Sequence, residues 1–110
     1  MIKLPTTDKE PRYTYIFTDD IDPEPVQNLI NVLHAHEKID LFFCTDGGLV
    51  LAMEALIHYM NQHPDLNIYL TYQVCSCGTD ILHKFKGNIF ITNQLDFFLF
   101  HAVDRKTYQV

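Results

Sequence analysis

Two turns of small residues and one histidine supply the groups of an acyl-transfer site. The turn at residues 45–48 reads Thr-Asp-Gly-Gly, the turn at residues 75–78 reads Cys-Ser-Cys-Gly, and His101 follows further along the chain. A serine hydroxyl can attack a carbonyl carbon, an imidazole can take the hydroxyl proton, and backbone N–H groups can stabilise the resulting oxyanion. The pattern therefore predicts nucleophilic chemistry at Ser76.

Amphipathic spacing predicts the helices that flank these turns. A first helix is expected over residues 23–36, after Asp22 as N-cap, with its core face formed by Val26, Leu29, Ile30 and Leu33. A second helix is expected from residue 49 until His63-Pro64 closes it, with one side formed by Leu49, Met53, Leu56, Ile57 and Met60. A short third helix is expected over residues 81–85.

Strands are predicted where β-branched and aromatic residues gather between these helices. They are expected over residues 13–18, 39–44, 67–73, 88–92 and 95–103, the last two separated by a turn at Asn93-Gln94. Strands that alternate with helices favour an α/β domain with a largely parallel sheet. The carboxyl ends of parallel strands meet at one edge, so Gly47 and Ser76 are expected to lie near each other there. Ser76 would sit at the N-terminal end of the third helix, where free N–H groups and the helix dipole favour developing negative charge.

Size and composition restrict the function further. The chain of 110 residues suits one domain over residues 13–110, preceded by a flexible lead-in at residues 1–12. The net charge of −6, with dispersed Lys and Arg, disfavours nucleic acid and anionic membranes as partners. The apolar run at residues 49–60 is too short to span a bilayer. Three cysteines, an odd number, indicate a reducing, cytoplasmic setting rather than a disulfide framework.

Three segments resemble the proteolytic subunit of Clp protease, in the same order and at similar spacing. The segment Ile39-Asp40-Leu41-Phe42-Phe43-Cys44-Thr45-Asp46-Gly47-Gly48 resembles that family's strand ending in Ser-Pro-Gly-Gly. Cys75-Ser76-Cys77-Gly78 resembles its Ala-Ser-Met-Gly, and Phe98-Leu99-Phe100-His101 resembles its Met-Ile-His. The resemblance covers roughly residues 13–103.

The resemblance implies a fold and a set of residue roles. The fold would be a Clp-protease-like or crotonase-like spiral of strand-strand-helix units. Ser76 would be the nucleophile and His101 the general base, while Gly47 and Cys77 would supply backbone N–H groups to the oxyanion hole. It also implies a peptide or unfolded-protein substrate, a homo-oligomer and a partner ATPase, without cofactor or metal.

Departures from the family's pattern keep alternatives open. Asp46 stands where the family has proline, and the family's catalytic aspartate and its strand-and-helix handle lie beyond the histidine and have no counterpart in this sequence. The resemblance therefore implies a weak or impaired serine peptidase. The alternatives are a non-catalytic assembly or binding protein of the same fold, and acyl-CoA binding in the crotonase manner. Taken alone, Ser76 is also a good helix-capping residue.

Overall fold

The computed structural model describes the backbone of residues 11–99 and the side chains of residues 11–92. Strands and helices alternate along the chain, as expected. The order is β1 (Tyr13–Phe17), α1 (Pro23–Ala35), β2 (Ile39–Thr45), α2 (Val50–Gln62), β3 (Leu66–Cys75), the 3-10 helix η1 (Ser76–Thr79), α3 (Asp80–Lys84) and β4 (Asn88–Leu99). The four strands form one parallel sheet in the order β1-β2-β3-β4. The predicted α/β class with a parallel sheet is confirmed.

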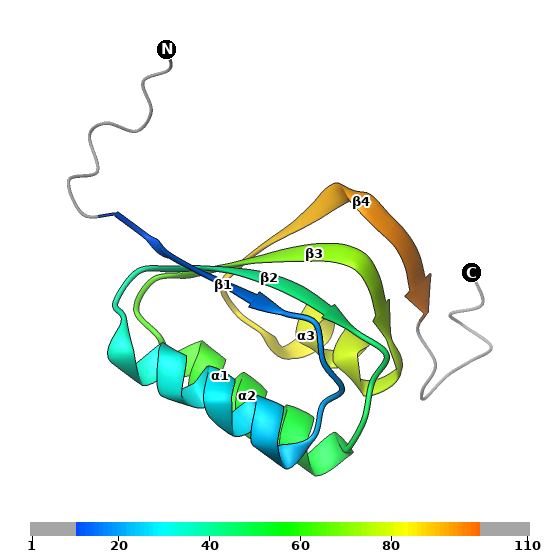
Figure 1. Ribbon diagram of the computed structural model, residues 1–110, viewed down its shortest axis with the longest axis horizontal. Helices are drawn as coiled ribbons and strands as arrows, with labels where there is room; N and C mark the ends of the chain where they lie inside the picture. Colours follow the sequence, from blue (N-terminus) through cyan, green and yellow to red (C-terminus); the bar gives the residue numbers. More distant parts are fainter. Residues whose placement is uncertain (1–10, 100–110) are drawn as a thin grey trace.

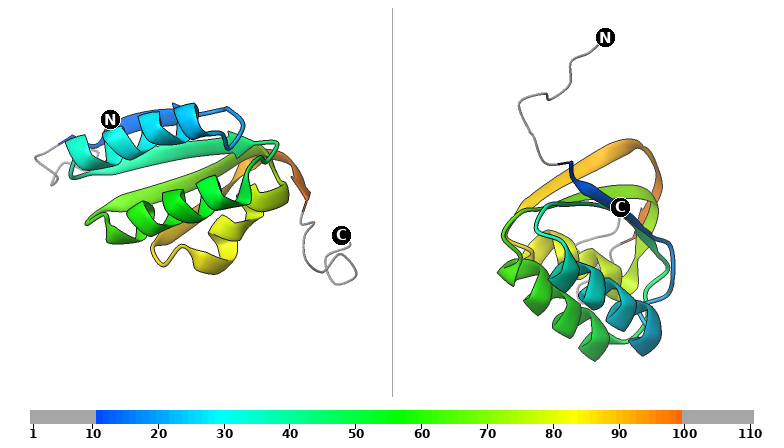
Figure 2. Two further views of the ribbon diagram at one scale, coloured as in Figure 1. Left: turned by 90° about the horizontal axis from the view of Figure 1, so that it is seen from below. Right: turned by 60° about the vertical axis from the view of Figure 1, so that its left-hand side comes forward.

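The helices lie on one face of the sheet (Figures 1 and 2). This follows from the topology, because right-handed crossovers between strands that add in one direction place every helix on the same side. The helix α1 buries Val26, Leu29, Ile30 and Leu33, the four residues that its periodicity predicted. The helix α2 buries Met53, Leu56, Ile57 and Met60. Leu49 was wrongly grouped with these residues, because it precedes the helix as its N-cap and is 52% exposed.

The strand β4 corrects a second expectation. Residues 88–99 form one strand instead of two strands around a turn at Asn93-Gln94. The pairing with β3 moves from Leu70↔Ile91 to Tyr72↔Leu95, so β4 carries extra residues at this point and the ladder continues in the same direction. The polar Asn-Gln pair therefore marks a bulge, which bends a strand without reversing it. Figure 1 shows β3 and β4 curving together there.

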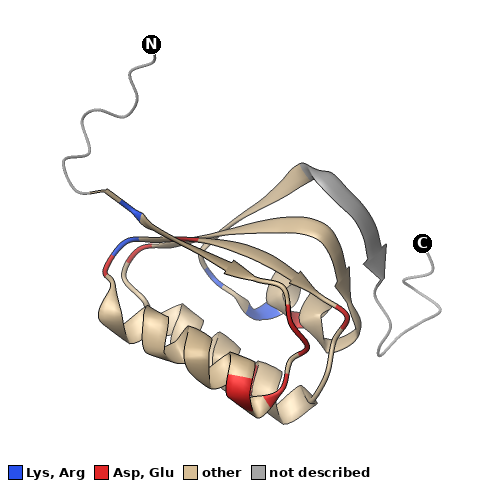
Figure 3. Ribbon diagram, viewed as in Figure 1, with Lys and Arg blue, Asp and Glu red and all other residues tan. Residues whose placement is uncertain are grey.

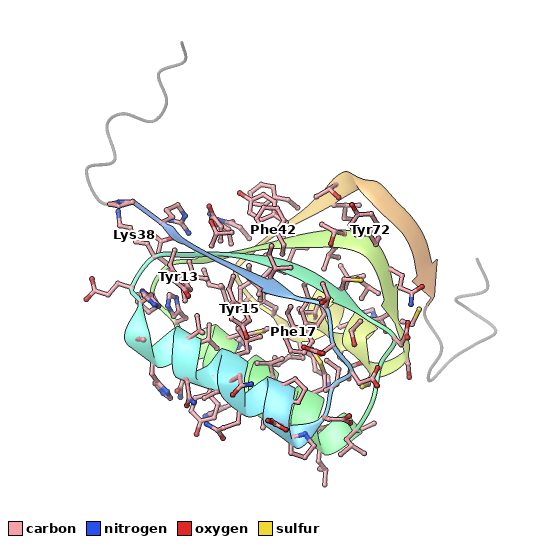
Figure 4. The ribbon with its side chains drawn as sticks, in the orientation of Figure 1. Tyr13, Tyr15, Phe17, Lys38, Phe42 and Tyr72 are labelled. Carbon is pink, nitrogen blue, oxygen red and sulfur yellow. The ribbon has the colours of Figure 1, made fainter. Side chains whose placement is uncertain are left out.

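The face of the sheet without helices carries a row of large apolar side chains. Ile16, Phe42, Tyr69 and Phe90 are aligned by register across β1, β2, β3 and β4. The rings of Phe42 and Tyr69 stack with centroids 4.8 Å apart, and those of Tyr69 and Phe90 stack at 5.0 Å. Figure 4 shows Phe42 on the side of the sheet opposite to α1 and α2. We call these four residues the aromatic row, although Ile16 at its β1 end is aliphatic.

Arg12 joins the amino-terminal edges of three strands. Its guanidinium donates to Asp40 Oδ1 at 2.7 Å, to Asp65 Oδ1 at 2.9 Å and to the carbonyl oxygen of Ile39 at 2.9 Å. Burial lowers the pKa of the Arg12 guanidinium, but the hydrogen bonds and charges of Asp40 and Asp65 outweigh burial and raise that pKa overall. Arg12 was predicted as the last residue of a flexible lead-in; residues 1–10 lie outside the described part, so that boundary remains a prediction.

Replacing Arg12 is expected to lower the free energy of unfolding. Arg12→Ala should cost about 1–2 kcal/mol, because two partly exposed carboxylates lose a shared charged donor. Arg12→Lys should recover only part of this loss, since an ammonium cannot reproduce the planar fork. Urea unfolding followed by circular dichroism measures both changes.

Lys84→Ala is the matched control, because its side chain is exposed at the end of α3. It should change the free energy of unfolding by less than about 0.5 kcal/mol. Equal losses for Lys84→Ala and Arg12→Ala would contradict the role given to Arg12.

Candidate active site

Backbone hydrogen bonds join the segments that follow the first two strands. The N–H of Ile21, in the loop after β1, donates to the carbonyl oxygen of Gly47 at 2.8 Å. The N–H of Leu49 donates back to the carbonyl oxygen of Ile21 at 2.9 Å. Ile21 and Gly48 thereby form an isolated parallel bridge, and Ile21 is fully buried. The loop after β1 is thus fixed against the glycine turn after β2.

Gly48 makes this contact possible. Its φ is +153°, and a Cβ atom added there would lie 2.4 Å from the carbonyl oxygen of Ile21. A side chain would therefore collide with backbone, which cannot turn away as a side chain can. The second glycine of the turn is required by packing alone.

Gly47 brings the glycine turn into contact with Ser76. Its φ is +113°, and an added Cβ would lie 2.5 Å from Ser76 Cβ and 3.0 Å from Ser76 Oγ. The structure thus brings together the glycine predicted for the oxyanion hole and the predicted nucleophile. The roles themselves remain predictions.

Ser76 occupies a strained backbone conformation at the end of β3. Its φ is +54°, in the left-handed region that a residue with a Cβ atom adopts at a cost of about 1 kcal/mol or more. Its carbonyl oxygen accepts a hydrogen bond from Thr79 Oγ1 at 2.7 Å. The N-cap of η1 is Cys75, and no side-chain hydrogen bond caps this helix. The capping alternative for Ser76 therefore finds no support in the geometry, and its partly exposed side chain faces Gly47.

The backbone N–H of Gly47 already has an acceptor. It donates to Thr45 Oγ1 at 3.1 Å, and the Thr45 side chain is buried beneath the turn. This N–H can serve an oxyanion only by sharing its proton with Thr45 Oγ1 or by turning away from it. Composition does not predict this competing bond, because a threonine in a turn can direct its hydroxyl to several backbone groups.

Cys77 lies beside the same turn. Burial raises the pKa of its thiol above the ordinary value, a hydrogen bond with the Gly48 backbone works in the opposite direction, and the charge of Asp80 raises it again. The thiol therefore loses its proton less readily than an ordinary cysteine, which makes Cys77 a poorer nucleophile. Its predicted part in the site concerns its backbone N–H.

His101 lies outside the described residues, and its role as general base remains a prediction. The described end of β4 is close to the site in register, since Leu99 pairs with Cys75, the residue before Ser76. The strand β4, which precedes His101 in the sequence, therefore runs beside β3, which ends one residue before Ser76.

A cavity of about 230 Å³ lies at the opposite edge of the sheet, near the carboxyl ends of α1 and α2. Its lining includes His34, His36 and His63, and His63 Nε2 hydrogen-bonds the carbonyl oxygen of His36 at 2.7 Å. Within the described residues, no group of three or more His, Cys, Asp or Glu could hold a metal ion. In the same part of the chain, no helix is long and apolar enough to cross a membrane.

Solved structures of ClpP proteases share this fold. The ClpP protease catalytic domain from Plasmodium falciparum matches with a TM-score of 0.61 at 16% sequence identity, over 82% of this chain and 55% of that chain. ClpP1 from Listeria monocytogenes matches with a TM-score of 0.58 at 22% identity, over 62% of this chain and 44% of that chain. The chain thus has a ClpP-like fold and spans about half the length of these structures. No protein-family model matches the sequence, and no curated protein matches it.

Gly47→Ala is expected to destabilise the fold and separate the glycine turn from Ser76. The new methyl group would overlap Ser76 Cβ at a backbone conformation unfavourable for alanine, which should cost about 2–4 kcal/mol. Thermal unfolding gives the loss in stability.

Gly87→Ala is the matched control. Its φ is not positive, and its added Cβ would first meet the far end of the Phe85 ring, which can turn. The expected loss is about 1 kcal/mol or less. If Gly47→Ala were as stable as Gly87→Ala, the close approach of Gly47 to Ser76 would be wrong.

Proposed function

We propose that this chain is a serine-peptidase-like domain that hydrolyses peptide bonds through Ser76. The observation that carries the proposal is the contact of Gly47 with the Ser76 side chain, where Ser76 holds a left-handed backbone at the end of β3. A strained serine between a strand and a helix, beside a turn rich in backbone N–H groups, is a recurrent arrangement for acyl transfer. The ClpP-like fold supports the same reaction class.

The proposed reaction uses four residues. Ser76 Oγ attacks the peptide carbonyl carbon while His101 takes the hydroxyl proton and later gives it to the leaving amine. The backbone N–H groups of Gly47 and Cys77 stabilise the oxyanion, that of Gly47 by sharing its proton with Thr45 Oγ1. Water then cleaves the acyl-enzyme and restores the serine.

Asp46 makes the proposed activity weak toward ordinary peptides. It lies between Thr45 and Gly47 with an exposed side chain. Its negative charge beside a developing oxyanion raises the energy of the transition state, because like charges repel.

A serine-directed fluorophosphonate probe tests the proposal with little ambiguity, because Ser76 is the only serine in the chain. The wild-type chain should form one adduct, located at Ser76 by peptide mass spectrometry. Ser76→Ala and His101→Ala should lower labelling, and turnover of a fluorogenic peptide, about a thousandfold or more.

Thr14→Ala removes an exposed hydroxyl from β1 and is the matched control. Its labelling and turnover should equal those of the wild type. A folded wild-type chain that neither reacts with the probe nor cleaves peptides would overturn the proposed hydrolysis.

The second candidate is an assembly or binding protein of the same fold, and the aromatic row favours it. Ile16 is 65% exposed and Phe90 is 45% exposed on the face of the sheet without helices. Adjacent exposed apolar side chains of this size mark interaction surfaces more often than isolated ones do. We propose that copies of this chain associate through the aromatic row, with or without catalysis at Ser76.

Charged substitutions in the aromatic row should reduce this self-association. Ile16→Lys and Phe90→Lys place an ammonium on the proposed contact, so light scattering after gel filtration should show smaller species than for the wild type. Circular dichroism checks that both variants remain folded.

Leu51→Lys is the control, because Leu51 is 78% exposed on α2 and lies outside the aromatic row. It should leave the wild-type assembly unchanged. A monomeric wild type, or equal assembly of all variants, would exclude association through this face. A partner ATPase and a cytoplasmic setting remain expectations from the resemblance and from the cysteine content.

A further inference from the structure

Three exposed acidic residues lie in the glycine turn that contacts Ser76 and in the loop bonded to it. Asp46 directly precedes Gly47, while Asp20 and Asp22 flank Ile21, which is hydrogen-bonded to Gly47 and Leu49. These backbone bonds, at 2.8 and 2.9 Å, hold the loop after β1 beside the turn after β2. The acids come from two separate loops, yet the fold fixes both against the same turn.

None of these three carboxylates forms an ion pair within the described residues. Asp22 is the N-cap of α1, but its side chain makes no capping hydrogen bond. The acids at the other edge of the sheet differ, since Asp40 and Asp65 both pair with Arg12. No basic side chain in the described part of the chain therefore balances these three charges.

The described basic residues gather at one edge of the parallel sheet. Arg12, Lys38 and Lys86 come before β1, β2 and β4, so they lie at the amino-terminal edge of the sheet. The acids named above follow β1 and β2 and lie at the carboxyl-terminal edge. Figure 3 shows red segments in the loop after β1 and at the end of β2, with the blue segments elsewhere. Among the residues that the structure describes, the edge that holds Ser76 therefore carries acidic side chains.

We propose that Asp46, supported by Asp20 and Asp22, makes the Ser76 site select peptides that carry Lys or Arg next to the scissile bond. This inference rests on the proposed hydrolysis at Ser76. A cationic side chain bound beside Asp46 offsets the repulsion between that carboxylate and the oxyanion. An acidic peptide adds a further negative charge and is rejected.

Three fluorogenic peptides that differ only in Lys, Gln or Glu beside the scissile bond test this selectivity. The full-length wild type should have a kcat/KM roughly tenfold higher for the Lys peptide than for the Glu peptide at low salt. Added NaCl should reduce the ratio, because screening weakens interactions between exposed charges. Asp46→Asn should lower the ratio about two- to fivefold, partly by improving cleavage of the Gln and Glu peptides.

Glu37→Gln is the matched control, because it also removes one negative charge. Glu37 is exposed near the opposite edge of the sheet. It should keep the wild-type ratio. Anisotropy measurements of the same peptides on Ser76→Ala report binding without turnover, and the Lys peptide should again bind more tightly than the Glu peptide.

The outcomes distinguish the two proposals. Cleavage of all three peptides at equal rates, or a ratio that Asp46→Asn leaves unchanged, overturns the charge selectivity and retains hydrolysis. Charge-selective binding that Asp46→Asn weakens, without any cleavage, supports recognition of cationic peptides and overturns hydrolysis. Neither cleavage nor selective binding overturns both.

Discussion

The approach of three backbone segments at the carboxyl edge of the sheet is the constraint on which the other features of the site depend. Gly48 packs against the backbone of Ile21, and Gly47 packs against Ser76, each at a distance that excludes a Cβ atom. Interiors packed to this density tolerate little added volume. The loop after β1, the turn after β2 and the end of β3 are therefore held in one arrangement.

That arrangement also determines the electrostatics of the site. Because the loop after β1 is fixed by Ile21, the acids on either side of this residue are held near the Ser76 edge. At the other edge, Arg12 pairs with both Asp40 and Asp65 while it joins β1, β2 and β3. Arg12 thus stabilises the edge of the sheet where the strands begin. At the edge where the strands end, no described Lys or Arg forms an ion pair with Asp20, Asp22 or Asp46.

Helices with a regular spacing of apolar residues were predictable from the sequence. Features that depend on how strands pair were not. The buried face of α1 follows directly from the spacing of Val26, Leu29, Ile30 and Leu33. The polar pair Asn93-Gln94 has the composition of a turn, but β3 supplies a parallel partner on both sides of it and the strand continues. Tertiary pairing therefore overrides the local signal. The aromatic row was also beyond prediction, because only the register shows that its members lie side by side.

Some features of the candidate site were likewise predictable from the sequence, and others were not. The sequence order predicted that Gly47 and Ser76 would lie near each other, because both follow parallel strands. The bond from the Gly47 N–H to Thr45 Oγ1 and the left-handed Ser76 depend on details of the turn that composition does not contain. His101 lies outside the described residues, so its placement in the site stays a prediction.

Packing explains the residue type at Gly48 but not at Ser76. Gly48 is explained by packing alone, since any Cβ there would meet backbone. No such argument explains a serine at φ +54°, where glycine would adopt the same backbone without strain. Its side chain is only partly buried, and no side-chain hydrogen bond caps η1, so neither core packing nor capping offsets that strain. Our proposal that this hydroxyl attacks a peptide carbonyl would account for a serine at this position.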